Sequence, residues 1–242
     1  ATPDGYTVLV TSTAFAINPT LYRNAGYDAI KGFEPVINAG YSPTILFAHP
    51  SANVASVKEL IALGKTKPLS YASAGIGTVP FLTVEYLFNV VSKINMTHVP
   101  YGGAGPALQA VLGGHVQVGA ATFATPGLGE WFATGRLKPL ALMAAQRSKL
   151  RPEIPTASEA GFPNYVDSTW QGVFVPAGTP RAIVEKFNAG MVQGMQSPSV
   201  SEALTKIGFD REPNNAKQFR EYVHAEVGRW AKVVQDTGAK AD

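Results

Sequence analysis

The sequence of 242 residues contains no cysteine, which excludes a cysteine nucleophile, a zinc–thiolate site and an iron–sulfur cluster. The absence is compatible with an oxidising compartment without proving one. Histidine is also scarce, because the chain has only His49, His98, His115 and His224. None of them has a second histidine or an acid at metal-binding spacing. We therefore expect no metal site and no cofactor. For His98 we expect a buried ring that is hydrogen-bonded to the backbone.

Charge is sparse as well, because charged residues make up 15% of the chain and the net charge is +3. There is no run of lysine and arginine and no basic stretch interleaved with aromatic residues, so nucleic-acid binding is not expected. No apolar window is long enough to span a membrane, and the opening Ala1–Gly5 is typical of a turn rather than of a signal peptide. With 45% hydrophobic residues, the chain can bury a core without staples, and we expect a soluble globular protein.

Catalytic motifs are missing too. The chain has no Gly-x-Ser-x-Gly elbow, and its glycine-rich loops carry no acid that could act as a general base. The sequence therefore lacks the groups that acyl transfer or phosphoryl transfer would need, and we expect no enzyme and no catalytic residue.

Strands and helices alternate along the chain. Short β-rich runs predict strands at 6–11, 33–41, 44–48, 69–72, 97–99, 116–121, 140–144 and 169–176. Helical spacing and capping residues predict a short turn at 20–22 and helices at 56–65, 80–91, 107–112, 180–195, 200–207 and 216–237. This alternation indicates an α/β fold with largely parallel sheets.

Two glycine-rich loops each lie between a predicted strand and a predicted helix, at Ser73–Thr78 (SAGIGT) and Pro100–Pro106 (PYGGAGP). Glycine lets the backbone approach a ligand closely, and free N–H groups before a helix attract an anion. The first loop is neither a phosphate-binding loop nor a dinucleotide motif. Each alone is equally consistent with an ordinary turn, but two such loops in one sheet converge on one crevice. A third loop, Ala120–Pro126 (AATFATP), is either part of that site or a plain buried loop.

In its motifs the chain resembles the Bug family, the TctC-like solute receptors of tripartite tricarboxylate transporters. The resemblance covers essentially the whole chain, and the combination of motifs is more specific than any one of them. It rests on Pro3–Thr7, Asn18-Pro19, Leu21-Tyr22, Phe33–Val36, Tyr71–Ser73, Gly75, Gly77-Thr78, His98–Tyr101, Gly103, Pro106-Ala107, Gly113-Gly114, Val116, Val118, Pro155-Thr156, Glu159–Gly161 and Pro176–Pro180.

The resemblance implies an α/β, type II periplasmic-binding-protein-like fold with a hinge between two lobes of mainly parallel sheets. Lobe 1 would comprise 1–48 and 167–242, and lobe 2 would comprise 49–166. It also implies that backbone N–H groups, hydroxyls and waters hold a carboxylate ligand. The residues expected in that ligand shell are Ser12, Thr13 and Ala14 from lobe 1, and Ser73, Gly77, Thr78, Tyr101, Gly102, Gly103, Ala104, Thr122 and Phe123 from lobe 2.

Two departures from the family pattern stand out. Relatives usually begin with a further strand, ligand loop and helix, which this sequence lacks, so part of the pocket and a covered sheet edge would be missing. In addition, amino-acid-binding relatives carry an acid within the loop that corresponds to Ala120–Pro126, and this loop has none. We therefore expect a dicarboxylate, hydroxy acid or aromatic acid without an ammonium group. Phe123 and Trp170 could stack on an aromatic ligand or belong to the core.

The function expected from the sequence is that of a monomeric periplasmic binding protein that delivers a small organic carboxylate to membrane transporter subunits. Two alternatives stay open at this point. The same fold could present its closed form to a membrane sensor kinase, or it could be the effector-binding domain of a regulator, although no DNA-binding helix-turn-helix precedes it in this sequence.

Overall fold

The computed structural model describes residues 1–211 and 214–241, and the chain divides into two compact units. The first unit holds Ala1–Tyr41, Thr169–Gln235 and the chain from Lys240, and the second holds Ser42–Ser168 and Asp236–Ala239. The boundary near the N-terminus falls inside strand β2 (Phe33–Ala48), between Tyr41 and Ser42, whereas the sequence placed it after residue 48. That the units act as hinged lobes stays a prediction.

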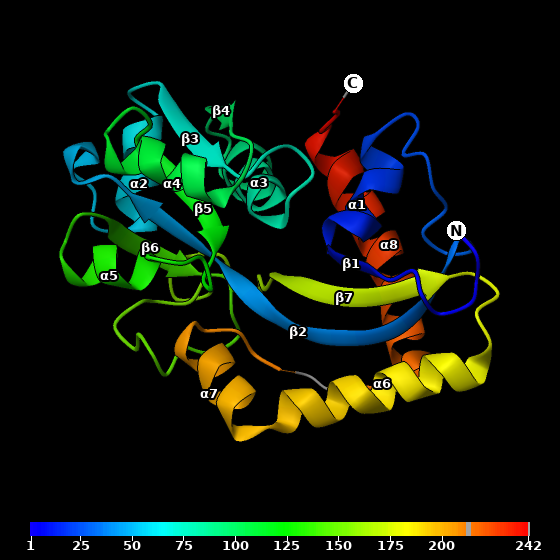
Figure 1. Cartoon of the computed structure of the whole chain (residues 1–242). Helices are drawn as coiled ribbons and strands as arrows, with labels where there is room; N and C mark the ends of the chain where they lie inside the picture. The colour runs from blue at the N-terminus through cyan, green and yellow to red at the C-terminus, as the bar shows by residue number, and fades with distance from the viewer. Residues whose placement is uncertain (212–213, 242) are drawn as a thin grey trace. The chain divides into compact units, whose positions relative to one another are not determined.

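The first unit is built on three neighbouring strands: β1 (Leu9–Ser12), β7 (Ser168–Pro176) and the first part of β2. Strand β1 pairs antiparallel with β7, with Leu9 opposite Phe174. Its helices are α1 (Ala14–Leu21), α6 (Arg181–Gln196), α7 (Pro198–Lys206) and α8 (Ala216–Thr237). Figure 1 shows α1 and α8 on one face of these strands and α6 on the other.

The alternating side chains of β7 form the core of the first unit on both faces of the sheet. Val173 and Val175 pack in a buried cluster that includes side chains of α6. Phe174 lies on the opposite face, where its ring centroid is 4.6 Å from that of Phe15 and 5.1 Å from that of Phe219. A strand buried on both faces explains why this segment is apolar almost throughout.

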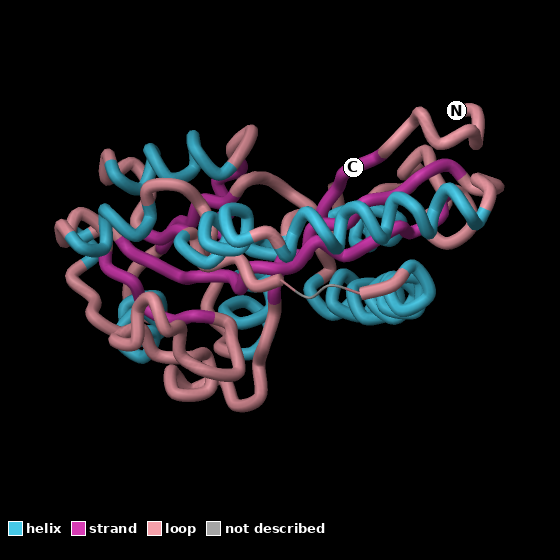
Figure 2. The backbone as a smooth tube through the Cα atoms, turned by 60° about the horizontal axis from the view of Figure 1, so that its bottom comes forward, coloured by secondary structure: helices cyan, strands magenta, loops and turns pink. Residues whose placement is uncertain are grey.

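In the second unit the strand order is β4–β3–β5–β2–β6. Strand β3 is parallel to β4 and β5, whereas β2 is antiparallel to β5 and β6. Figure 2 shows strands running between helices in each unit. The elements are η1 (Pro50–Ala52), α2 (Val57–Gly64), β3 (Leu69–Ser73), α3 (Val79–Val84), the π-helix η2 (Glu85–Val91), β4 (Met96–Pro100), α4 (Ala104–Leu112), β5 (Val118–Thr122), α5 (Leu128–Ala133) and β6 (Lys138–Leu142).

The α/β class is confirmed, but the sheet of the second unit is mixed rather than mainly parallel. Parallel neighbours require a crossover connection, such as the helices between β3, β4 and β5. Strand β2 is one continuous strand and is antiparallel to its neighbours β5 and β6. The prediction of two strands at 33–41 and 44–48 was therefore wrong. Ser42 and Pro43 have the composition of a turn but do not break β2. The Ser42 hydroxyl accepts the N–H of Ala124 and the Pro43 carbonyl accepts the N–H of Phe123, which holds this part of the strand in place.

The other elements also show where local pattern and structure differ. The helix expected at 80–91 begins as α3 and widens into η2, where the N–H of Ser92 bonds to the carbonyl of Leu87, five residues earlier. Helix α1 extends well beyond the turn expected at 20–22, and α5 was not predicted. Among the described residues, none of the helices combines the length and apolar character needed to cross a membrane.

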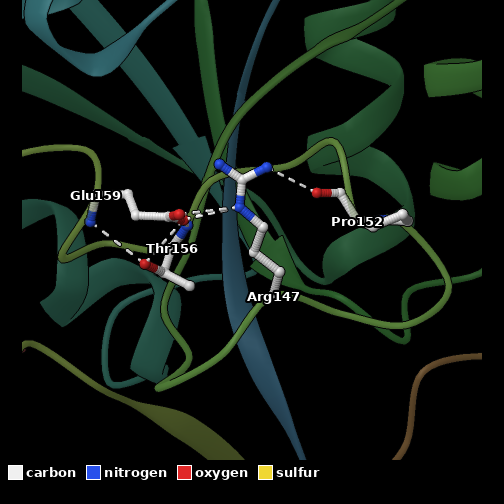
Figure 3. A network of polar contacts seen from close by, with 4 residues as sticks. All are labelled: Arg147, Pro152, Thr156 and Glu159. Carbon is white, nitrogen blue, oxygen red and sulfur yellow. Dashed lines mark hydrogen bonds and ion pairs between the residues drawn. The ribbon is translucent and has the colours of Figure 1, made fainter.

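The irregular segment after β6 is fastened by a polar network centred on Arg147 (Figure 3). Its guanidinium Nε donates to both carboxylate oxygens of Glu159 at 3.0 and 2.9 Å, and Nη1 donates to the carbonyl of Pro152 at 2.8 Å. Glu159 also accepts the backbone N–H of Thr156 at 2.8 Å. The Arg147 guanidinium, followed by this N–H bond, lowers the pKa of Glu159 to about 2.

Because the pKa of Glu159 is depressed in the folded protein, its contribution to stability should be complete above pH 4.5 and lost as the pH falls toward 2. We expect Glu159→Gln to make the melting temperature decline less steeply than in the parent protein over that interval. Thermal melts between pH 2 and pH 6 check this expectation. Arg147→Gln should flatten the profile similarly, and the double variant should add little. Parallel profiles for Glu159→Gln and the parent would contradict it.

Candidate functional site

The first two glycine-rich loops meet at one edge of the sheet in the second unit. Strands β3 and β4 are parallel and in register, with Ser73 opposite Pro100, so the loops that follow them leave the sheet side by side. The N–H of Tyr101 bonds to the carbonyl of Ser73 at 3.2 Å. A Cβ atom built on Gly75 would lie 3.3 Å from the Tyr101 carbonyl oxygen. The structure thus brings these two candidate loops into direct contact.

The first loop presents backbone donors that the chain leaves unused. Gly75 and Gly77 have φ angles of 125° and 85°, a region that disfavours other residues and turns the chain sharply. Within the described residues, the N–H groups of Ile76, Gly77 and Thr78 donate to no other group of the chain. Adjacent backbone N–H groups without a partner carry a partial positive charge that suits an anion.

The hydroxyls of this loop support the turn. The Ser73 side chain is fully buried, and its oxygen accepts the N–H of Gly75 at 3.2 Å. Thr78 donates to the carbonyl of Gly75 at 2.8 Å and accepts the N–H of Phe81 at 3.4 Å, which caps α3. Both hydroxyls therefore hold the loop in shape in this structure, and their predicted direct contact with a ligand stays a prediction.

The second loop is similar in character. Gly103 has a φ of 150°, and within the described residues the N–H groups of Gly102, Gly103 and Ala104 have no acceptor in the chain. Gly102 is exposed, while Tyr101, Gly103 and Ala104 are half-buried. Neither this loop nor the first contains a charged residue. An anion at this edge would therefore meet neutral backbone dipoles rather than a guanidinium or ammonium group.

The third candidate loop follows β5, the other neighbour of β3. Here the N–H groups are used within the chain, because Phe123 donates to Pro43, Ala124 to Ser42 and Thr125 to Thr122. The Thr122 hydroxyl pairs with that of Thr125 at 3.1 Å. Phe123 is only 9% exposed and belongs to the buried cluster beneath α4 and α5. This geometry favours the interpretation of a packed loop.

The candidate residues of the first unit lie where β1 ends and α1 begins. Thr13 is fully buried, accepts the N–H of Trp170 at 2.9 Å and donates its own N–H to the Trp170 carbonyl at 3.2 Å. Trp170 is itself fully buried in this unit, so its ring belongs to the core. Ser12 and Ala14 are half-buried. A contact of these residues with a ligand stays a prediction.

His98 was expected to bond to the backbone, and that was wrong. Its Nε2 lies 2.8 Å from the Ser73 hydroxyl, because the parallel register of β3 and β4 places the two side chains on the same face. Burial lowers the pKa of His98 to about 4, so the ring is neutral at physiological pH. The sequence offered no signal for this contact, since it depends on strand pairing.

Metal chemistry finds no support in the geometry of the described part of the chain. Over residues 1–211 and 214–241, no three acidic, histidine or cysteine side chains gather closely enough to hold a metal ion. The arrangement at the loop edge is suited instead to non-covalent binding of an anion by neutral donors.

Comparison with known proteins agrees with this picture. The family model described as "Tripartite tricarboxylate transporter family receptor" (TctC) matches residues 1–239. Protein BugT of Bordetella pertussis (strain Tohama I) is 32% identical over 241 residues, and the match covers 98% of this chain and 73% of BugT.

Three solved structures are similar over nearly the whole chain, and they confirm the expected periplasmic-binding-protein-like fold. The periplasmic binding protein BugD has a TM-score of 0.90 and 27% identity, covering 99% of this chain and 81% of BugD. A protein of R. palustris with adipate has a TM-score of 0.91 and 30% identity, with coverages of 99% and 80%. MatC from Rhodopseudomonas palustris, with bound malate, has a TM-score of 0.88 and 30% identity, with coverages of 97% and 81%.

Proposed function

The chain belongs to the TctC family of tripartite tricarboxylate transporter receptors, and from this premise we propose that it captures a small organic carboxylate outside the cytoplasm for a tripartite tricarboxylate transporter. The resemblance inferred from the motifs is confirmed over residues 1–239. Proteins of this family are solute-binding receptors, so the expectation that the chain is not an enzyme is also confirmed. Delivery to transporter subunits and a periplasmic location are part of the proposal.

The observation that carries the proposal is the cluster of free backbone N–H groups at the shared edge of the first two loops. A carboxylate has about four lone-pair sites, and N–H groups can occupy them with charge-assisted hydrogen bonds. The donors are already fixed by the turns, so a ligand would not have to order them. They belong to Ile76, Gly77, Thr78, Gly102, Gly103 and Ala104.

The chemistry of the same loops supports a ligand without an ammonium group. A buried ammonium group is held most strongly by an anionic partner, because desolvating a bare charge is costly. No acid lies in either of the first two loops or in the third. Two structural neighbours were solved with the dicarboxylates adipate and malate. We therefore propose a dicarboxylate, hydroxy acid or aromatic acid as the substrate class.

Ligand binding to the folded state should raise the melting temperature. At a concentration one hundred times the dissociation constant, the expected stabilisation is about 2.7 kcal/mol, which corresponds to roughly 5–10 °C for a chain of this size. Thermal melts with adipate, malate, benzoate, glutamate and aspartate as separate probes measure this shift. We expect at least one acid that lacks an amine to give it.

The amino acids serve as the internal control, since they share the carboxylates and add an ammonium group. Glutamate and aspartate should shift the melting temperature less than the best amine-free acid. If either stabilised the protein more than every amine-free acid, the proposed substrate class would be wrong. If none of a broad panel of carboxylic acids bound, the proposal of a carboxylate receptor would fail as a whole.

A further inference from the structure

The His98 ring is clamped between two aromatic side chains beneath the first glycine-rich loop. Its centroid lies 4.8 Å from the ring of Tyr71 in a stacked arrangement and 4.6 Å from the tilted ring of Phe81. Tyr71 is on β3, opposite His98 in the parallel register, and Phe81 is on α3. The ring is thus fixed from the strand side and from the helix that follows the loop.

Tyr71, one of the two rings that pack on His98, is held by a series of hydrogen bonds that the proposed function does not use. The Tyr71 hydroxyl donates to Glu85 of η2 at 2.5 Å, and the Asn89 amide donates to the other Glu85 oxygen at 2.7 Å. The side-chain oxygen of Asn89 accepts the N–H of Met96, at the start of β4, at 3.1 Å. Glu85 and Asn89 are four residues apart in η2, and their bonds to Tyr71 and Met96 place both side chains on the side that faces β3 and β4. This leaves the Tyr71 ring little freedom to move away from His98.

The free edge of the clamped ring meets the loop at Ser73. His98 Nε2 is 2.8 Å from the Ser73 oxygen, which also accepts the Gly75 N–H at 3.2 Å. Ser73 therefore links a rigid imidazole to the first peptide group of the turn. The next three N–H groups, those of Ile76, Gly77 and Thr78, are the free donors of the candidate site.

We propose that His98 is a positioning residue that, through Ser73, sets the direction in which the free N–H groups of residues 76–78 point. The inference rests on the proposed function, since those groups are the proposed carboxylate donors. The lowered pKa of His98 agrees with it, because the ring does not change to the charged form, in which both nitrogens donate, within the physiological pH range.

Three substitutions separate the hydrogen bond from the ring packing. His98→Phe keeps an aromatic ring between Tyr71 and Phe81 but removes Nε2. His98→Gln removes the ring but carries an amide that reaches the place of Nε2 and can either donate or accept. His98→Asn is too short to reach Ser73 and removes the ring as well. His224→Gln, at an exposed position of α8, is the matched control.

The first readout needs no ligand: amide hydrogen exchange at Gly75, measured by NMR, reports on the bond from Gly75 N–H to Ser73. We expect His98→Phe and His98→Asn to speed this exchange about 3- to 10-fold, the factor that corresponds to the net free energy of one hydrogen bond. His98→Gln should restore near-parental exchange despite lower thermal stability, and His224→Gln should change neither quantity.

The second readout is the affinity for adipate and malate, measured by calorimetry. If either binds, His98→Phe should weaken it about 3- to 10-fold and His98→Gln should leave it within twofold of the parent. Unchanged Gly75 exchange in His98→Phe would overturn the positioning role whether or not an acid binds. Parental affinity in His98→Phe, or a Gln variant as weak as the Asn variant, would also overturn it. If neither acid bound but exchange responded as expected, adipate and malate would be excluded as ligands and the role of His98 in positioning the loop would stand.

Discussion

Replacing Glu226 with alanine is expected to lower the free energy of unfolding by about 3–4 kcal/mol. Glu226 is 4% exposed, and one of its oxygens accepts the indole N–H groups of both Trp170 and Trp230, at 3.1 and 2.9 Å. The other oxygen faces Arg229 at 3.1 Å. Removing the carboxylate would leave two buried indole donors without a partner and a cavity beside them.

The loss of stability should extend to the candidate residues of the first unit, because Trp170 also bonds Thr13. The Trp170 N–H donates to the Thr13 hydroxyl, and the Trp170 carbonyl accepts the Thr13 N–H. Urea unfolding followed by fluorescence measures the loss. Glu226→Gln keeps an acceptor of the same size and should cost only about 1 kcal/mol. Glu221→Ala on the same helix is the matched control, since that side chain is exposed and pairs only weakly with Lys217 at 4.0 Å. A Glu226→Ala variant as stable as Glu221→Ala would refute the anchoring role.

Features of the fold that depend on local pattern could be predicted from the sequence. Helix α8 spans Ala216–Thr237, which are the limits expected from its periodicity. Ser56 caps α2, since its side-chain oxygen accepts the Glu59 N–H at 3.2 Å, while the Glu59 carboxylate accepts the N–H of Ala55 at 2.8 Å, one residue before the cap. The two glycine-rich loops also follow strands and precede helices as expected, because glycine and proline act within a few residues of where they stand.

Other features depend on which segments meet in space, and they could not be predicted from the sequence alone. Ser42-Pro43 has the composition of a break, yet partners more than 70 residues away keep the strand continuous. The third loop resembles the first two in composition, but the N–H groups of Phe123 and Ala124 donate to Pro43 and Ser42. His98 binds Ser73 only because β3 and β4 pair in one particular register. Pairing of this kind cannot be inferred from spacing along a single chain.

Gly75→Ala is expected to reduce the affinity for the best-binding carboxylic acid at least 10-fold. Gly75 has a φ of 125°, which a residue with a side chain rarely adopts, and its Cβ would press on the Tyr101 carbonyl at 3.3 Å. The carbonyl belongs to the backbone of the second loop, so it can yield only if that backbone shifts by a few tenths of an ångström. Strain of this kind costs about 1–3 kcal/mol, and its relief would turn the peptide groups on either side of residue 75.

The matched control for this prediction is Gly105→Ala, the same change in the neighbouring loop. Gly105 lies in the first turn of α4, its φ is not positive, and a Cβ there would meet no atom within 4 Å. Alanine also favours a helix over glycine by about 0.5–1 kcal/mol, so this variant should be at least as stable as the parent. Calorimetric titration and urea unfolding of both variants separate the outcomes. If Gly75→Ala bound as tightly as Gly105→Ala, the close approach of the two loops would be irrelevant to binding, and the carboxylate would have to be held elsewhere.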